Sequence, residues 1–234
     1  MGKAFDITLT WGFLQQLVPY LSVTLQILVI SMLIGIVFGI VAAIPRLFGI
    51  PVLSQLVILY VSFIRGTPIL IQLFLVFYGV PALLLFIGID VSRMDAIYFV
   101  MITYAISNGA VFSEIFRSAI QSVDYGQTEA ALSVGMKDAQ NFFRIILPQA
   151  WSIALPNVAN SVIGSLKDTS LAFTIGVMDM VGRGETLIAS TAHALEVYIS
   201  LSIIYYIVVL IIEKTFQVFE KRANRHKAAS VHLA

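Results

Sequence analysis

The apolar runs of this chain are too long for a water-soluble fold. Apolar residues make up 59% of the 234 residues and charged residues only 12%, whereas soluble domains carry about 25% charged residues. A transmembrane helix needs about 20 consecutive apolar residues, and the runs here exceed that length. Transmembrane β-strands would appear as alternating segments of about 10 residues, a pattern that is not seen. We therefore expect an all-α integral membrane protein.

These runs predict five membrane-spanning helices. They cover residues 21–47, 68–87, 96–120, 150–175 and 195–219. The second belongs to a 36-residue apolar region, 52–87, which is too long for one straight span and is interrupted by Arg65-Gly66-Thr67-Pro68. Its early part, 52–64, is predicted to be a tilted or interfacial helix. The predicted divisions are an external segment 1–20, a transmembrane domain 21–219 with a cytoplasmic loop 121–149, and a basic tail 220–234.

The basic residues predict the orientation, because cytoplasmic segments of membrane proteins are rich in Lys and Arg. With the loop 121–149 inside, ten basic residues fall on or near the cytoplasmic side: Arg46, Arg65, Arg117, Lys137, Arg144, Lys214, Lys221, Arg222, Arg225 and Lys227. Three fall outside, namely Lys3, Arg93 and Arg183, and Lys167 lies within a span. We expect an external N-terminus and a cytoplasmic C-terminus, which agrees with an odd number of spans.

Composition also excludes several kinds of site. The net charge of +1 gives no sign of nucleic-acid binding, and the absence of cysteine rules out thiolate catalysis and Cys-ligated metals. The three histidines lack metal-ligand spacing, and the sequence has no phosphate-binding Gly-x-x-x-x-Gly-Lys-[Ser/Thr] motif. A cleaved signal peptide is not expected, because no basic region precedes the first apolar run. No cofactor and no metal are predicted for this chain.

The loop between the third and fourth spans carries the most specific motif. Glu129-Ala130-Ala131 is followed after three residues by Gly135, and after nine more by Ile145 and Leu147-Pro148. The composition predicts a helix around 127–134 that Gly135 ends, and a second helix over 138–146 that Asp138 caps. Pro148 is predicted to end this second helix and to begin the next span. The alternative is an ordinary helical hairpin, since a central glycine is common in loops.

The spacing of the loop motif resembles the docking loop of ABC-type importer permeases, the type I importer family. The resemblance implies that a separate ATPase subunit pushes on this loop, while ATP and magnesium bind to that partner. It assigns the ATPase contact to Glu129, Ala130, Ala131, Leu132, Gly135, Met136, Lys137 and Asp138. Gly135 would allow a close backbone approach, and Leu132 and Val134 would fill a pocket of the partner.

Three further motifs resemble the polar amino acid branch of these permeases. They are Arg65-Gly66-Thr67-Pro68-Ile69-Leu70 with Gln72; Ser107-Asn108-Gly109-Ala110 with Glu114-Ile115-Phe116-Arg117 and Gly126-Gln127; and Lys167-Asp168-Thr169-Ser170-Leu171. With the loop, they cover residues 52–175, about half of the chain. The resemblance therefore implies an amino acid as the transported solute.

Glu114 and Arg117 are three residues apart and share one face of a helix. One interpretation is a local ion pair that fixes the third span. The other is that Glu114 points into the transport path with Asn108, where a carboxylate could hold the ammonium group of a substrate. Charges at membrane depth are costly and should in either case be paired or face the bundle interior.

The motif of the fourth span offers a second candidate substrate site. Lys167 and Asp168 point about 100° apart on a helix, so each should meet a different partner. Asp168 could accept the ammonium group of an amino acid, and the hydroxyls of Thr169 and Ser170 could donate to its carboxylate. The alternative is polar contact between helices, which Ser and Thr often provide in membrane bundles.

Two other segments are open to two interpretations each. Arg65, Gly66 and Pro68 mark either a simple span boundary or a hinge used in gating, because glycine and proline both weaken a helix. The segment 181–185 contains two glycines and is predicted to be a flexible outer loop, either a plain turn or a contact for an external solute-binding protein.

The sequence as a whole indicates the transmembrane subunit of an ATP-driven amino acid importer in the bacterial cytoplasmic membrane. The resemblance implies a partner ATPase, an external binding protein and a second permease chain, identical or homologous. Five helices are few to enclose a solute path, and a pair of chains would supply ten. The alternatives are a secondary transporter, which usually contains an internal repeat, and an intramembrane enzyme, which needs a catalytic cluster. Neither feature is seen.

Overall fold

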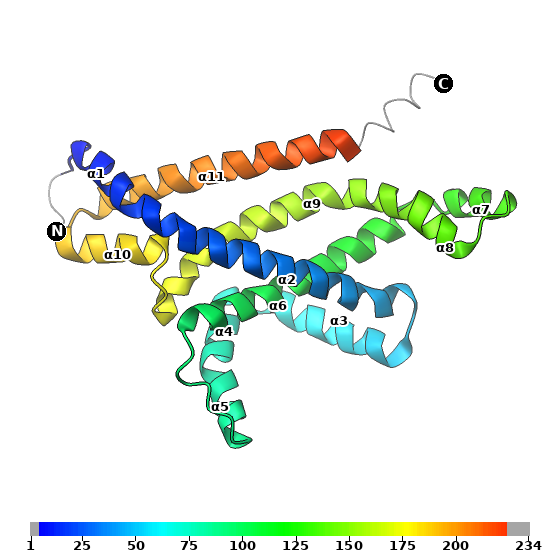
Figure 1. Ribbon diagram of the computed structural model, residues 1–234, viewed down its shortest axis with the longest axis horizontal. Coiled ribbons are helices and arrows are strands. Elements are labelled where there is room, and N and C mark those ends of the chain that lie inside the picture. Colours follow the sequence, from blue (N-terminus) through cyan, green and yellow to red (C-terminus); the bar gives the residue numbers. More distant parts are fainter. Residues whose placement is uncertain (1–4, 224–234) are drawn as a thin grey trace.

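The computed structural model describes residues 5–223 as a bundle of long helices (Figure 1). The helices are α1 (Thr8–Leu17), α2 (Leu21–Leu47), α3 (Pro51–Gly66), α4 (Ile69–Phe74), α5 (Val80–Phe86), α6 (Ala96–Gln121), α7 (Tyr125–Ser133), α8 (Asp138–Asn141), α9 (Leu147–Asp168), α10 (Met180–Thr191) and α11 (Ala194–Ala223). Short 3-10 or π turns join them at Val18–Tyr20, Leu75–Gly79, Phe142–Ile146 and Thr169–Ile175. The prediction of an all-α protein is confirmed.

Within the described residues, four helical stretches are long and apolar enough to cross a membrane: Thr8–Leu47, Ile69–Phe86, Ala96–Gln121 and Ala194–Ala223. The predicted spans therefore correspond to α2, α4–α5, α6 and α11. The fourth predicted span, 150–175, is also helical as α9 and the 3-10 turn after it. It is less apolar than the others, and it is not one of these four stretches.

The helical stretch that contains the first predicted span begins before residue 21. The helix α1 and a 3-10 turn at Val18–Tyr20 join α2 into one stretch from Thr8 to Leu47. Phe13 and Leu17 of α1 are buried in a cluster that includes Leu201 of α11. Pro19 does not interrupt this path because it stands in the first turn of the 3-10 segment, where its missing N–H is tolerated. The predicted external segment 1–20 is thus largely helix in its described part; the tail beyond residue 223 lies outside the described residues.

The predicted break between the two parts of the second apolar region is confirmed. Gly66 ends α3, and Thr67 (φ −118°, ψ 139°) and Pro68 are extended, as expected for a residue before proline. One side of α3, with Val61 and Ile64 buried, packs against α2 and α6, and most of the rest of the helix is exposed. At 1.5 Å per residue it carries Arg65 roughly 24 Å from the turn before Pro51. Arg65 therefore does not lie beside Arg46, contrary to its predicted place at the same end; Arg225 and Lys227 lie outside the described residues.

The centre of the bundle is the close contact between α2 and α6. A Cβ added at Gly35 would lie 2.7 Å from the Cβ of Asn108, and one added at Gly39 would lie 2.6 Å from the Cβ of Phe112. In the same way, a Cβ added at Gly109 of α6 would lie 2.6 Å from Cδ1 of Phe38 on α2. Helices in membranes associate through such van der Waals contact, which small residues permit.

The predicted end of a helix at Pro148 is wrong. The helix α8, a π turn at Phe142–Ile146 and α9 form one uninterrupted helical path from Asp138 to Asp168. Pro148 lies in the first turn of α9, directly after the π turn, where the wider local geometry accommodates its missing N–H. The part of the polar loop from Asp138 onward and the fourth span therefore form one helical rod.

The predicted flexible loop at 181–185 is also wrong, because these residues belong to α10. Asp179 caps this helix by accepting a hydrogen bond from the Gly182 N–H at 2.8 Å. The two glycines serve packing instead: a Cβ at Gly184 would lie 2.8 Å from Leu201 Cδ1. Burial raises the pKa of the Asp179 carboxyl, although backbone N–H groups, first that of Gly182, oppose the rise.

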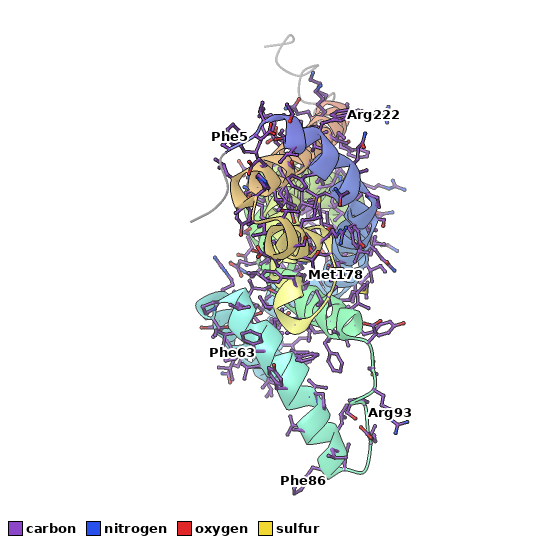
Figure 2. All side chains as sticks on the ribbon, turned by 90° about the vertical axis from the view of Figure 1, so that its left-hand side faces the viewer. Phe5, Phe63, Phe86, Arg93, Met178 and Arg222 are labelled. Atoms are coloured by element: carbon purple, nitrogen blue, oxygen red, sulfur yellow. The ribbon has the colours of Figure 1, made fainter. Side chains whose placement is uncertain are left out.

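The ends of the bundle differ in what they carry (Figure 1). The α7–α8 hairpin lies at the end where α11 finishes, and α10 lies at the opposite end with the start of α1. A separate arm formed by α4, its π turn and α5 projects from the body of the bundle. Figure 2 shows Phe86 at the tip of this arm, and this side chain is 94% exposed.

Candidate functional site

The α7–α8 hairpin confirms the predicted helix around 127–134 and its end at Gly135. Gly135 has a φ of +80°, in the left-handed region that favours glycine. Its N–H donates to the Leu132 carbonyl at 2.9 Å, and the Met136 N–H donates to the Ala131 carbonyl at 3.1 Å. These bonds close the last turn of α7 as glycine C-caps commonly do. The chain therefore reverses sharply and starts α8 three residues later.

Most of the predicted docking residues lie on the surface of this hairpin. The exposed ones are Glu129, Ala130, Leu132, Gly135, Lys137 and Asp138, while Met136 is half-buried. Val134 is 76% exposed and Leu132 is 46% exposed. Ala131 differs, because its side chain is only 3% exposed and contributes to the packing of the hairpin itself. The exposed apolar tip is a surface that a partner protein can cover.

Asp138 does not cap the helix that follows Gly135, contrary to the prediction. It is the first residue of α8, and Lys137 holds the cap position. The Lys137 N–H donates to Gln140 Oε1 at 3.1 Å, so Gln140 satisfies the free backbone group instead. The carboxylate of Asp138 is left exposed at the tip of the hairpin.

A buried asparagine ties the two helices of the hairpin together. Asn141 Nδ2 donates to Thr128 Oγ1 of α7 at 3.3 Å, and Asn141 is only 5% exposed. Behind this contact is an apolar groove of about 890 Å³ between the hairpin and the ends of α2, α6 and α9. The residues that line it include Phe48, Phe116, Phe142 and Trp151. Because the groove separates the hairpin from the ends of the other helices, the hairpin is supported mainly by the Asn141–Thr128 contact and by the continuous helix into α9. No feature of the motif had indicated Asn141.

Glu114 forms an ion-pair cluster near the hairpin end of α6. Its carboxylate accepts from Arg46 of α2 at 2.5 Å and also from Arg117, one helical turn further along α6. Arg117 in turn donates to Gln121. Of the two interpretations of Glu114, the structure has the ion pair, with Arg46 as an additional partner that only the packing of α2 on α6 revealed.

The substrate candidates from the third and fourth spans divide into buried and accessible groups. Asn108 is 6% exposed, and its Oδ1 accepts a hydrogen bond from Ser165 Oγ of α9 at 2.7 Å. Thr169 is fully buried and donates to the Leu166 carbonyl. These two residues connect helices and helical turns, which is the polar-contact alternative. The structure brings Asn108 close to the Lys167–Ser170 motif, whereas Glu114 lies more than one turn further along α6.

Lys167 and Asp168 are the accessible members of the motif. Lys167 is exposed, Asp168 and Ser170 are partly exposed, and neither charge has an ion-pair partner among residues 5–223. The backbone carbonyl of Asp168 accepts from the hydroxyl of Tyr104 on α6 at 2.6 Å, which fixes the end of α9. Within the described residues, no group of three or more histidine or carboxylate side chains could hold a metal ion. The two free charges are therefore available to a ligand.

The break at residues 65–68 is closed by a side chain. Gln72 of α4 is 5% exposed, and its Nε2 donates to the Ile64 carbonyl at 2.7 Å and to the Thr67 carbonyl at 2.9 Å. Pro68 has no N–H to give to Ile64, its helical partner four residues earlier. The Gln72 amide replaces that donor, and the break is a defined structure in which Arg65 remains exposed.

We predict that Gln72→Leu destabilises the protein by about 1 to 2 kcal/mol, because the buried Ile64 carbonyl and the partly buried Thr67 carbonyl lose their donor. The measurement is the thermal unfolding midpoint in detergent. Gln55→Leu is the matched control, since Gln55 is exposed on α3, and it should leave the midpoint nearly unchanged. Equal midpoints for the two variants would show that Gln72 does not support the break.

Comparison with known proteins agrees with these geometric features. Residues 35–225 match the family described as the binding-protein-dependent transport system inner membrane component. The chain belongs to this family. It is a permease, the non-catalytic membrane component of a bacterial ABC transporter that works with an ATPase.

Individual relatives place the permease in amino acid uptake. It is 55% identical to the L-cystine transport system permease protein TcyL of Bacillus subtilis, and the match covers 99% of this chain and 97% of that protein. It is 31% identical to the glutamine transport system permease protein GlnP of Escherichia coli, over 93% of this chain and 97% of that one. Among solved structures, a crystal structure of an amino acid ABC transporter with histidines matches 94% of this chain and all of that chain, with a TM-score of 0.83 and 30% identity.

The permease is thus the membrane component of an ABC amino acid uptake system in the inner membrane. The predicted family, its function and its location are confirmed. The alternatives of a lone secondary transporter and of an intramembrane enzyme are not supported.

Proposed function

We propose that the permease forms an amino acid path together with a second permease chain, and that an ATPase drives it through the α7–α8 hairpin. The observation that carries this proposal is the hairpin itself: an exposed apolar tip, a left-handed Gly135, and an uninterrupted helical path into α9. ATP and magnesium would bind only to the ATPase. The contact surface we propose comprises Glu129, Ala130, Leu132, Gly135, Met136, Lys137 and Asp138.

The continuous rod from α8 to α9 supports a mechanical role for the hairpin. A push on the tip would reach α9 through the backbone, because the chain stays helical from Asp138 to Asp168 with no loop between α8 and α9. ATP can drive a change of conformation only if the ATPase binds the two conformations with different affinity. We propose that closure of the ATPase dimer draws two hairpins together and opens the path outward, and that hydrolysis returns it inward.

The proposed orientation places the hairpin and the end of α11 in the cytoplasm. The bundle supports it, because both lie at one end with Arg46, Arg117 and Arg144 nearby. Segments that face the cytoplasm are rich in such residues. α10 would then lie outside, where an external solute-binding protein could reach it. We keep the break at Arg65, Gly66 and Pro68 as a candidate hinge.

The proposed solute is a polar amino acid, and L-cystine is the first to test because the relative at 55% identity is named for it. Lys167, Asp168 and Ser170 are the side chains we propose to contact it. Lys167 would meet the α-carboxylate and Asp168 the α-ammonium group. Asn108 and Thr169 would hold the helices that carry them, and Glu114 would fix α6 to α2.

The function is tested with the permease and its ATPase reconstituted in liposomes, with and without a binding protein. ATPase rate and uptake are measured against L-cystine, L-glutamine, L-histidine and a non-amino-acid solute. We expect both rates to rise together with one amino acid class only. Uptake that proceeds equally without ATP, or a complex that ignores every amino acid, would contradict the proposal.

We predict that Asn141→Ala lowers solute transported per ATP hydrolysed, because α7 is no longer tied to the rod that enters α9 (distance 3.3 Å). Loss of one such hydrogen bond is worth about 1 kcal/mol, so a several-fold drop is expected with the ATPase still bound. Gln127→Ala, an exposed position on α7, is the control. Thr128→Val should match Asn141→Ala, and the double variant should be no worse than either; additive losses would argue against the contact.

A further inference from the structure

The side of α9 that the other helices leave open is polar. Packing against α6, α11 and α2 buries one side of α9, including Ala154, Val158 and Leu166. The opposite side exposes Asn157, Asn160, Gly164 and Lys167. At 100° per residue these four positions fall within roughly 80° of one another, with Asp168 at the edge. They form one stripe, which we call the α9 stripe.

The α9 stripe differs from the exposed sides of the other long helices. On α2 the exposed residues include Leu33 (61%) and Val37 (63%), and on α11 they include Tyr206 (65%) and Ile211 (60%). Such side chains suit lipid. Two amides and an ammonium group do not, because polar groups in hydrocarbon are costly and charged ones more so. Consistently, α9 is not among the helices apolar enough to span a membrane alone.

The polar residues of the α9 stripe are better explained if the stripe faces water than if it packs in a dry contact against a second protein chain. Lys167 has no ion-pair partner among residues 5–223, so in a dry contact the second chain would have to supply its counter-charge, because a buried unpaired charge is strongly destabilising. Nothing lies within 4 Å of the position that a Cβ at Gly164 would take, so this glycine leaves open space beside the stripe. Amides can donate and accept hydrogen bonds at once, and Lys167 and Asp168 supply one charge of each sign. This chemistry complements a zwitterionic amino acid.

We propose that Asn157, Asn160, Gly164 and Lys167 line the aqueous path of the transporter, with Lys167 holding the α-carboxylate of the solute and the two amides forming its route toward the hairpin end. Along the helix axis the stripe with Asp168 is about 16 Å long. The inference rests on the proposed amino acid importer. It extends the candidate site from one motif to a track along α9.

The natural absence of cysteine makes this proposal directly testable. Single cysteines at the four positions are introduced into the complex in liposomes, and labelling by the charged reagent 2-sulfonatoethyl methanethiosulfonate is followed by mass spectrometry. Because the thiolate is the reactive form, cysteines in water should label about 10-fold faster or more than those in lipid or protein. Leu33→Cys and the buried Val158→Cys are the controls. Stripe labelling no faster than these controls would overturn the proposal, whether lipid or a second chain covers the stripe.

A solute should also slow the labelling. L-cystathionine is the probe, because it is a thioether analogue of cystine and cannot exchange with the introduced thiols. We expect it to slow labelling at Asn160→Cys and Lys167→Cys several-fold and to leave the controls unchanged. Fast labelling that no amino acid affects would show water there but overturn the role of the stripe in holding solute.

The charge of Lys167 is tested separately by chemical rescue. Lys167→Cys should lower uptake about 10-fold or more, as expected for losing one hydrogen bond from a charged group. Modification with 2-aminoethyl methanethiosulfonate restores an ammonium group and should restore most uptake, whereas the sulfonate reagent should not. Equal effects of both reagents would overturn the carboxylate assignment. If the cysteine-free parent takes up no amino acid, the proposed function fails, while the labelling rates still report whether water reaches α9.

Discussion

Replacing Gly135 by aspartate is expected to abolish uptake while leaving the permease folded in the membrane. Gly135 has a φ of +80°, and no atom lies within 4 Å of the position that a Cβ would take. Aspartate tolerates this backbone conformation better than most residues, so the isolated permease should keep its hairpin. A carboxylate at the tip would instead clash with the ATPase surface and bring an unpaired charge into the contact. Loss of a central contact of this kind weakens association by about 100-fold, or roughly 3 kcal/mol.

The structure offers a matched control for this substitution. Gly88 has a φ of +83° and also has nothing within 4 Å of a Cβ, but it follows α5 at the tip of the projecting arm. Gly88→Asp thus introduces the same charge and the same backbone strain away from the hairpin. Co-purification with the ATPase and ATP-dependent uptake are measured for both variants. The docking assignment predicts that only Gly135→Asp loses both; normal uptake by that variant would contradict it.

The largest effect on folding is expected from Gly39→Leu. A Cβ at Gly39 would lie 2.6 Å from the Cβ of Phe112, 3.0 Å from the backbone nitrogen of Ser113 and 3.1 Å from the Gly109 carbonyl. Because two of these neighbours are backbone atoms, they cannot move aside without parting α2 from α6. Overpacking by even one or two methylenes costs about 1–3 kcal/mol. We expect Gly39→Ala to lower the unfolding midpoint by several degrees and Gly39→Leu to yield no monodisperse protein.

Gly12 provides the comparison for Gly39. It also lies in a helix, α1, but nothing approaches within 4 Å of its Cβ position. Gly12→Ala and Gly12→Leu should leave yield and midpoint close to those of the parent. The measurements are size-exclusion behaviour and thermal unfolding in detergent. If Gly39→Leu were recovered as a stable protein, the close contact between α2 and α6 would not be the centre of the fold.

The spans were predictable because the bilayer imposes a length and an apolar character on every residue of a crossing helix. Apolar runs therefore located α2, α6 and α11 to within a few residues. The predictions were wrong where a glycine or a proline was present for a reason other than ending a helix. The glycines of α10 suggested a flexible loop, but they exist for contact with Leu201. Pro148 suggested a helix end, but the π turn before it absorbs the missing N–H.

The candidate site was predictable in its motifs but not in its partners. The spacing of Glu129, Gly135 and Pro148 indicated the hairpin. Lys167 and Asp168 were each expected to meet a partner on another helix, but neither has an ion-pair partner among residues 5–223. Contacts between residues far apart in sequence could not be predicted. Arg46 is 68 residues from Glu114, and Asn108 is 57 residues from Ser165. The pattern of residues along one helix does not indicate which residue of another helix they will contact.

The amino-acid order of this permease determined its class, its helices and its α7–α8 hairpin, because hydrophobic length, helix breakers and a spaced motif act over short stretches of chain. The tertiary structure decided which face of each helix is covered. That choice depends on how close two backbones can come, as at Gly35 and Gly39 against α6. It turned Glu114 toward two arginines and buried Asn141 between the two helices of the hairpin. It left Asn157, Asn160 and Lys167 of α9 uncovered, because the neighbouring helices enclose only the other side of α9.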